Sequence, residues 1–503
     1  MHTHRRPSVL HHAHAQRLCH SHVPSRDGAH ADDMVVWFDA RNRRPLEQSR
    51  NNGIPSLLVW GTLVLSLIVP TVLHAAAPES SSKLESKAAA LFKAGDFPAV
   101  ASLFRELPPD ATPSKSFLRL ALLSYVRLGR TDDALTIYAK LNQTGNSHDY
   151  SLLRPLALGV ITSHVRDRHE HVRIAAHSAL AELGLPETAA LLEDGLLDTS
   201  VVVRARAAEA IGKAGLAAKS GALRRALRDE MPTVRIAAMT ALGDAKASDV
   251  RQRLLDVART EDGPEAVFAY AALVKLGLSE KLNDIKNAAT LPDAESRMAA
   301  LGALGRLKHP GSLAVLSQAV YDPDPSVRAF AAGALGEFGS PNGVAPLTHA
   351  IGDEMGMVRG VAAASLGRLG IKENRPLLLA LTRDPNLHVR ASAAEGLLRL
   401  GDVSALTIAT DLARHKDPSI RGAAAQALSA SSDKQALTLL HALIQDQQPL
   451  PRLMAAKALR KSRAEAVPVL VQGLQDSDEA VRIASAQSLL QQIMQLTSGT
   501  RRR

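Results

Sequence analysis

Ser-Val-Arg-Ala-Phe-Ala at residues 326–331 is one of a series of near-copies of a single phrase. The phrase also reads His-Val-Arg-Ile-Ala-Ala at 171–176 and Met-Val-Arg-Gly-Val-Ala at 357–362. Its arginine recurs every 31 residues, with one empty position at Ala266 and a last copy one residue early, at Arg173, Arg204, Arg235, Arg297, Arg328, Arg359, Arg390, Arg421, Arg452 and Arg482. A fixed period of about 20 to 50 residues indicates an array of stacked units, each of which contacts only its neighbours. We therefore expect a surface that holds partners more than a site of chemistry.

The composition agrees with a helical array. Apolar residues make up 46% of the 503 residues and aromatic residues only 3%, which does not fit a β-sandwich or a β-barrel. The net charge of +10 invites a nucleic-acid interpretation, but its distribution weakens it. Residues 1–77 contribute +3 and Arg501–Arg503 another +3, which leaves +4 for residues 78–500. The array itself is close to neutral.

Cysteine usage and motif searches argue against catalysis. The single cysteine is Cys19, so the repeats contain no disulfide, thiolate nucleophile or cysteine metal site. The sequence has no nucleophile-elbow, phosphate-loop, dinucleotide-binding or zinc-protease motif. We expect no enzymatic activity, no catalytic or metal-binding residues in the repeats and no cofactor.

An apolar segment precedes the repeats. Leu57–Val69 is free of charge, follows Arg41, Arg43, Arg44 and Arg50, and is broken by Pro70. A basic flank, an apolar stretch and the small residues at 75–77 are the parts of a signal peptide, so 54–77 is predicted to be a signal peptide or a membrane anchor. A buried segment without such a role is the third alternative. The chain is thus expected in the cell envelope, periplasmic, either released by cleavage or held by an amino-terminal segment that contacts or crosses the membrane.

Residues 1–53 form a basic, histidine-rich head that we expect to be disordered. Eight of the 19 histidines lie in residues 1–33. They could form a metal-binding tract. The favoured interpretation is that Met34 is the true start, because a region of this length before the apolar segment is too long for an ordinary signal.

Residues 78–148 carry a different period. Leu91 and Tyr125, Gly95 and Gly129, and Phe104 and Tyr138 are each 34 residues apart, the tetratricopeptide length. This segment resembles two tetratricopeptide hairpins, which are too few for a separate domain. We expect them to stack on the array that follows.

Residues 149–496 resemble short HEAT-like repeats of the phycobilisome-lyase type. The features that carry the resemblance are Val-Arg early in the second helix, an aspartate six residues before the arginine, and a glycine that closes the helix at Gly184, Gly215, Gly277, Gly339, Gly370 and Gly401. The resemblance implies an all-α fold, a right-handed α-solenoid of about eleven 31-residue hairpins with the two tetratricopeptide-like hairpins at its amino end. Residues 497–503 are expected to be a disordered basic tail.

The repeated arginines could form a track for phosphate groups. The favoured interpretation is structural, because an aspartate stands in the turn of most units and the family pattern implies an internal Asp–Arg ladder. Each arginine can reach the aspartate of its own turn and that of an adjacent unit, because guanidinium presents its donors in a fixed fork. The predicted ladder consists of Asp167 and Arg173, Asp198 and Arg204, Asp229 and Arg235, Asp322 and Arg328, Asp353 and Arg359, Asp384 and Arg390, Asp446 and Arg452, and Asp476 and Arg482. At Ala266, where Thr260 replaces the aspartate, we expect the ladder to be broken and the solenoid softer.

Second helices of HEAT-like repeats line the concave side, so positions two, five and nine residues after the arginine are candidates for binding. These positions combine an apolar strip with a mostly basic rim, formed by Phe268, Phe330, Val361, Lys275, Arg306, Arg368 and Arg399. Such a strip suits an amphipathic helix or an extended peptide with acidic residues. Alternatively, the two phenylalanines fill gaps beside small neighbours.

The leading hypothesis is an exported bacterial scaffold that binds a protein or peptide along its concave face. One alternative is bilin-lyase-like or chaperone activity, as in phycobilisome-lyase HEAT proteins. Another is nucleic-acid binding, which we do not expect because residues 151–503 contain few aromatic side chains to stack on bases. The partner and the oligomeric state stay open.

Overall fold

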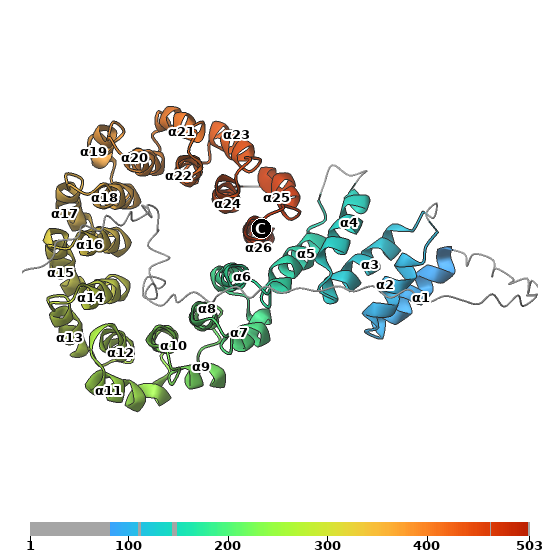
Figure 1. Cartoon of the computed structure of the whole chain (residues 1–503), viewed down its shortest axis with the longest axis horizontal. Coiled ribbons are helices and arrows are strands. Elements are labelled where there is room, and N and C mark those ends of the chain that lie inside the picture. The colour runs from blue at the N-terminus through green and yellow to red at the C-terminus, as the bar shows by residue number, and fades with distance from the viewer. Residues whose placement is uncertain (1–80, 109–111, 143–147, 463, 501–503) are drawn as a thin grey trace, which may run out of the picture.

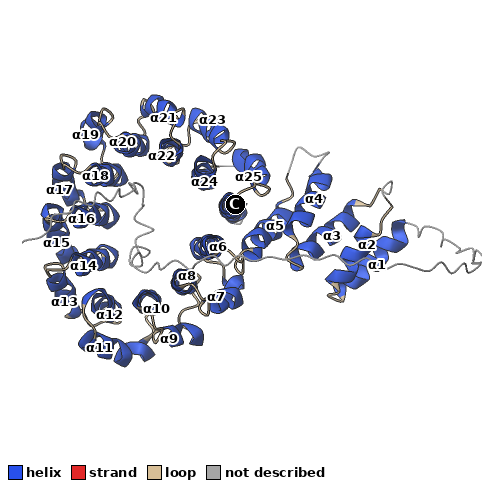
Figure 2. Ribbon diagram, in the orientation of Figure 1, coloured by secondary structure: helices blue, strands red, loops and turns tan. Residues whose placement is uncertain are grey.

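The computed structural model describes residues 81–500 apart from 109–111, 143–147 and 463. Every regular element within these ranges is a helix, and none is a strand (Figure 2). The predicted head at 1–53 and the predicted signal or anchor at 54–77 lie outside the described residues. None of the described helices is both long and apolar enough to cross a membrane.

Eleven helical hairpins follow one another from Tyr150 to Thr500, as the repeat count predicts. Their first helices are α5 (Tyr150–Ser163), α7 (Ala189–Gly195), α9 (Gly221–Ala226), α11 (Arg251–Thr260), α13 (Lys281–Ala288), α15 (Leu313–Gln318), α17 (Val344–Ala350), α19 (Arg375–Leu381), α21 (Ala405–Ala413), α23 (Lys434–Leu443) and α25 (Val467–Gly473). Their second helices are α6 (Glu170–Leu183), α8 (Val201–Lys213), α10 (Pro232–Asp244), α12 (Gly263–Lys275), α14 (Ala294–Leu307), α16 (Pro325–Phe338), α18 (Gly356–Arg368), α20 (Leu387–Arg399), α22 (Pro418–Leu428), α24 (Pro449–Ala458) and α26 (Glu479–Thr500).

Helix α16 illustrates how the repeated phrase specifies a second helix. The side chain of Asp324 caps its first turn by accepting hydrogen bonds from the backbone N–H groups of Ser326 and Val327. Val327 and Leu335 share one apolar stripe and are fully buried. Gly339 ends the helix with φ of 78°, a conformation that costs glycine nothing. All six closing glycines predicted from the sequence have positive φ, and in two other units Lys246 and Lys308 take their place.

Small residues let neighbouring second helices approach closely. The position eight residues after the arginine meets the position six residues after the arginine of the next unit. A Cβ added to Gly367 would lie 2.2 Å from the Cα of Gly396, and one added to Gly243 would lie 2.8 Å from the Cα of Ala272. The repeated small residues therefore fix the spacing between second helices.

Two further hairpins precede the array. They consist of α1 (Ser81–Lys93) with α2 (Phe97–Arg105) and α3 (Lys115–Arg127) with α4 (Thr131–Asn142). Gly95 and Gly129 form their turns with positive φ, and Tyr125 is buried edge-on against Phe104. Helices α3 and α4 pack on α5, so these hairpins stack on the array as expected.

The array closes into a ring, which the sequence did not predict. The last helix, α26, packs against both α5 and α6 of the first unit, and the two ends of the array meet (Figure 1). The second helices line the inside of the ring, the first helices form the outside, and α1–α4 project outwards. Helix α26 continues to Thr500, past the expected end of the array at 496, so the disordered tail predicted for 497–503 is wrong for residues 497–500.

Candidate functional site

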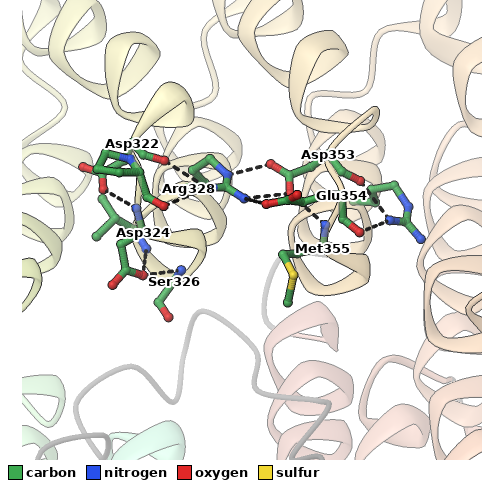
Figure 3. A network of polar contacts seen from close by, with 10 residues as sticks. Asp322, Asp324, Ser326, Arg328, Asp353, Glu354 and Met355 are labelled. Carbon is green, nitrogen blue, oxygen red and sulfur yellow. Dashed lines mark hydrogen bonds and ion pairs between the residues drawn. The ribbon is translucent and has the colours of Figure 1, made fainter.

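The arginine of each repeat joins two units. Arg328 on α16 donates through Nε and Nη2 to the two carboxylate oxygens of Asp353 in the next unit, at 2.6 and 3.0 Å. Its Nη1 donates to the backbone carbonyls of Asp322 and Pro323 in its own turn, at 3.0 and 3.2 Å. Figure 3 shows this arginine held between the turn of its own unit and the turn of the following one. The planar guanidinium suits this task because its donors have a fixed fork geometry.

The aspartate also shapes the turn in which it lies. Oδ1 of Asp353 accepts a hydrogen bond from the backbone N–H of Met355 at 2.9 Å, directly before α18 (Figure 3). The same bond forms at Asp198, Asp229, Asp322, Asp384, Asp446 and Asp476. Each carboxylate thus fixes its own turn and receives the arginine of the preceding unit.

The pairing confirms the predicted reach to an adjacent unit and corrects the predicted ion pair within each unit: the carboxylate comes from the next unit only. The ladder as observed consists of Arg173–Asp198, Arg204–Asp229, Arg235–Glu265, Arg297–Asp322, Arg328–Asp353, Arg359–Asp384, Arg421–Asp446 and Arg452–Asp476. In seven of the eight predicted pairs the aspartate of the same unit accepts a hydrogen bond through its backbone carbonyl, whereas Arg482 donates to the carbonyl of Leu474. The physical reason is reach: the turn carboxylate faces back along the array, towards the preceding arginine.

The ladder does not break before the unit at Ala266. Arg235 pairs with Glu265, a buried glutamate on α12 that replaces the missing turn aspartate. The missing link comes one joint later, between α12 and α14, because Ala266 has no guanidinium to offer. A second link is missing after Arg390, whose Nε donates to the backbone carbonyl of Asp384, since His415 occupies the aspartate position of the next unit.

Both ends of the ladder differ from its middle. The carboxylate of Asp167, in the first unit, accepts hydrogen bonds from the backbone and ring of His169. Arg482, in the last unit, pairs with Asp132 on α4 and not with Asp167. The contact that closes the ring therefore lacks the arginine–aspartate pair found between successive units.

Burial makes the ladder unsuitable as a phosphate track. In the eight pairs the arginine side chains are 9–17% exposed and the carboxylates 5–13% exposed. The hydrogen bonds from Arg421 keep the pKa of Asp446 below its ordinary value, and Asp446 in turn raises the pKa of Arg421. Both groups stay charged and satisfied within the wall of the ring, so neither is available to a ligand.

The candidate binding residues lie on consecutive second helices of the inner wall. Phe268 and Lys275 belong to α12, Arg306 to α14, Phe330 to α16, Val361 and Arg368 to α18, and Arg399 to α20. Phe268, Phe330 and Val361 are half-buried. Because these helices are covered on the outside and on both flanks, their remaining exposed faces line the lumen.

Packing explains part of the apolar strip. Ring atoms of Phe330 lie 3.2 Å from where a Cβ of Gly302 would be, so Phe330 fills the space beside that glycine. The Arg306 guanidinium stands over the ring of Phe268, 5.0 Å from its centre. Each aromatic ring therefore has one face on the wall and leaves part of its surface open.

Two of the four predicted basic residues are neutralised by neighbours. Lys275 pairs with Asp244 at 2.9 Å and Arg399 with Glu395 at 2.6 Å. Arg306 lies near the carboxylates of Asp244, Glu209 and Glu337, which interact with its charge. Arg368 is half-buried, and no ion pair joins it to a carboxylate among the described residues. The sequence analysis missed Asp244 and Glu395, although the i,i+4 spacing of Glu395 and Arg399 on one helix signals such a pair.

No group of three or more potential metal ligands occurs among the residues with described positions. The candidate residues on the inner wall supply apolar surface and basic groups, which can bind a ligand.

A ring of stacked two-helix units with this ladder defines an α-solenoid repeat protein. The family model for HEAT repeats matches residues 152–212, 197–275, 282–367, 344–429 and 409–491, well over half of the sequence, and the chain belongs to the HEAT repeat family. No curated protein matches it in sequence.

Three solved structures match parts of this chain at low sequence identity. Human deoxyhypusine hydroxylase is 20% identical over 50% of this chain and 98% of its own, with a TM-score of 0.29. The CpcE–CpcF phycocyanin lyase of Nostoc is 21% identical over 42% of this chain and 94% of its own, with a TM-score of 0.32. Kap121p is 13% identical over 72% of this chain and 53% of its own, with a TM-score of 0.33. These similarities concern the fold alone.

Proposed function

We propose that this protein is a non-catalytic scaffold whose ring holds a polypeptide partner against its inner wall. The observation that carries the proposal is the combination on α12–α18 of half-buried apolar side chains with the guanidinium group of Arg368, which forms no ion pair among the described residues. Partly exposed aromatic residues and arginines are the residue types that supply most binding energy in protein interfaces. The arginines of the ladder take no part, because they are bound within the wall.

The charge of Arg368 favours an acidic partner. Arg306 and Arg368 lie in the last turns of α14 and α18, where a basic side chain also interacts favourably with the helix dipole. Helix stabilisation would explain a basic residue at this position, and it leaves the guanidinium donors of Arg368 open to a ligand. A carboxylate on a partner can accept two of these hydrogen bonds at once.

The test is capture of envelope proteins by the full chain and by paired variants. Phe330→Asp and Arg368→Glu change the inner wall. Tyr321→Asp and Arg383→Glu are matched controls at exposed residues that follow the first helices α15 and α19. We expect the inner-wall variants to lose about 2 kcal/mol of binding free energy each, the typical size of a hot-spot substitution, and the controls to bind normally. Equal binding by all four variants would remove the inner wall as the site.

We also propose that the scaffold works in the cell envelope, which rests on the sequence of residues 54–77. Fractionation of cells that express the full chain, compared with a variant carrying Leu65→Arg and Leu67→Arg, tests this. The unchanged chain should accumulate in the envelope fraction and the variant should not, since charges in the apolar segment oppose membrane insertion. Equal amounts of both in the cytoplasm would contradict export.

A further inference from the structure

The two ends of the array bury the faces that an open solenoid would expose to water. Terminal repeats of open solenoids carry polar outer faces, because no neighbour covers them. Here the last helix is buried on almost every side: Val481, Leu489, Leu490 and Ile493 of α26 are at most 2% exposed. On the first helix, α5, the corresponding apolar residues Leu152, Leu153, Leu156 and Val160 are at most 3% exposed.

These two faces cover each other. Helix α26 packs on α5 and α6, and the buried residues of all three helices belong to one continuous apolar core. Polar contacts add to the joint: Gln487 donates to Glu182 at 2.6 Å, Arg460 lies 3.4 Å from the same carboxylate, and Arg482 pairs with Asp132. Opening the ring would expose apolar surface on both sides, so closure is part of the fold.

From this we infer that the ring stays closed and takes its partner by threading, as a flexible acidic polypeptide segment with a free end. The inference rests on the proposed function, since it concerns how a segment reaches the inner wall. A loop within a folded protein has no end to pass through a closed ring. The partner class is therefore a chain with a disordered, acidic terminal tail.

The expected size of the opening supports threading. Packed helices lie about 8–10 Å apart, so eleven second helices in a circle place their axes on a ring about 30 Å across. Subtracting about 5 Å of helix radius at each wall leaves an opening of about 20 Å. A single extended chain or one helix, about 10–12 Å across, fits this opening. A folded domain of about 240 residues, about 40 Å across, does not.

The experiment uses two defined probes and the full chain. Each probe contains a disordered segment of about 40 residues of glutamate, serine and leucine, long enough to cross the ring when extended. The first probe carries a fluorescent protein at one end only, and the second carries one at both ends. A third measurement uses a chain with Cys19→Ser, Glu182→Cys and Gln487→Cys, in which a short thiol-reactive linker locks the joint.

We expect the one-ended probe to bind the unchanged chain and the locked chain equally, and the two-ended probe to bind at least about tenfold more weakly to both. Arg368→Glu should weaken the one-ended probe, which shows that binding uses the inner wall. Equal binding of both probes, still sensitive to Arg368→Glu, would overturn threading and leave the proposed function standing. Failure of the one-ended probe to bind would overturn the proposed function and threading together.

Discussion

Replacement of a ladder arginine by an apolar residue of similar length should strongly destabilise the ring. Arg359 donates to both carboxylate oxygens of Asp384 at 2.7 and 2.9 Å and to two backbone carbonyls of its own turn. The Asp384 side chain is only 5% exposed. In Arg359→Met this carboxylate would keep a single hydrogen bond, from the backbone N–H of Asn386. Leaving one charge of a buried pair alone costs about 3–5 kcal/mol, and we expect Arg359→Met to fall in this range.

A double-mutant cycle separates the unpaired charge from the loss of the pair. Arg359→Met with Asp384→Leu removes both charges, and we expect it to cost less than Arg359→Met alone, about 1–2 kcal/mol, mainly for the lost bond to Asn386. Arg390→Met is the matched control, because Arg390 occupies the same position but donates only to a backbone carbonyl. It should cost about 1 kcal/mol.

The assay is urea unfolding followed by circular dichroism at neutral pH, with hydrogen exchange of α18 and α20 as a local measurement. The reasoning fails if Arg359→Met costs no more than Arg390→Met. It also fails if the double variant is less stable than Arg359→Met, because the pair would then contribute more than its unpaired carboxylate costs.

Three further predictions concern a carboxylate of the ladder, a left-handed helix end and a close contact between second helices. The hydrogen bond from Arg421 lowers the pKa of Asp446 in the folded state. The stabilisation by the Asp446 carboxylate is therefore complete above its unfolded pKa of about 3.9 and is lost as the pH falls through the lower folded pKa. The urea concentration at the unfolding midpoint should decrease below about pH 4, and it should decrease less steeply for Asp446→Asn. Lys308→Gly should raise the unfolding free energy by about 1 kcal/mol, because Lys308 has φ of 50°, whereas an unchanged or lower value would show that the left-handed backbone is not strained. Gly367→Ala should destabilise the protein by about 2 kcal/mol or more, because the added Cβ would lie 2.2 Å from the Cα of Gly396. The control Gly333→Ala should stabilise it by about 0.5–1 kcal/mol, because the added Cβ has room at 3.5 Å from Val361. Equal effects of the two variants on thermal unfolding would contradict the close approach of the second helices.

The repeat unit could be predicted from the sequence because its determinants are local and recur. The arginine period gives the number of hairpins, and the glycine eleven residues later marks the end of each second helix, as at Gly339. The direction of the ladder could not be predicted this way. An aspartate six residues before one arginine is also 25 residues after the preceding one, and a single period cannot distinguish these two partners. Glu265 was missed for a related reason, since it enters the ladder from the helix and not from the turn.

Closure of the ring has no local signal. It depends on small rotations between units that add up over eleven joints, and it brings together Glu182 and Gln487, which are 305 residues apart. The available hint was that α26 carries no charged residue after Arg482, although a terminal helix exposed to water should have a polar face. The same limit applied to the inner wall: the sequence placed Phe268, Phe330 and the basic residues on one face, but not the neutralising contacts of Lys275 and Arg399.

The measurement that tests the account most directly is the distance between the two ends of the array in solution. Spin labels at Ala190 on α7 and Gln472 on α25, both exposed, report on it in a chain with Cys19→Ser. A closed ring predicts one narrow distance distribution that stays the same at low and high salt, because the joint is mainly apolar. A broad distribution that extends to long distances would contradict closure of the ring, and it would also contradict the proposal that the partner threads through the ring.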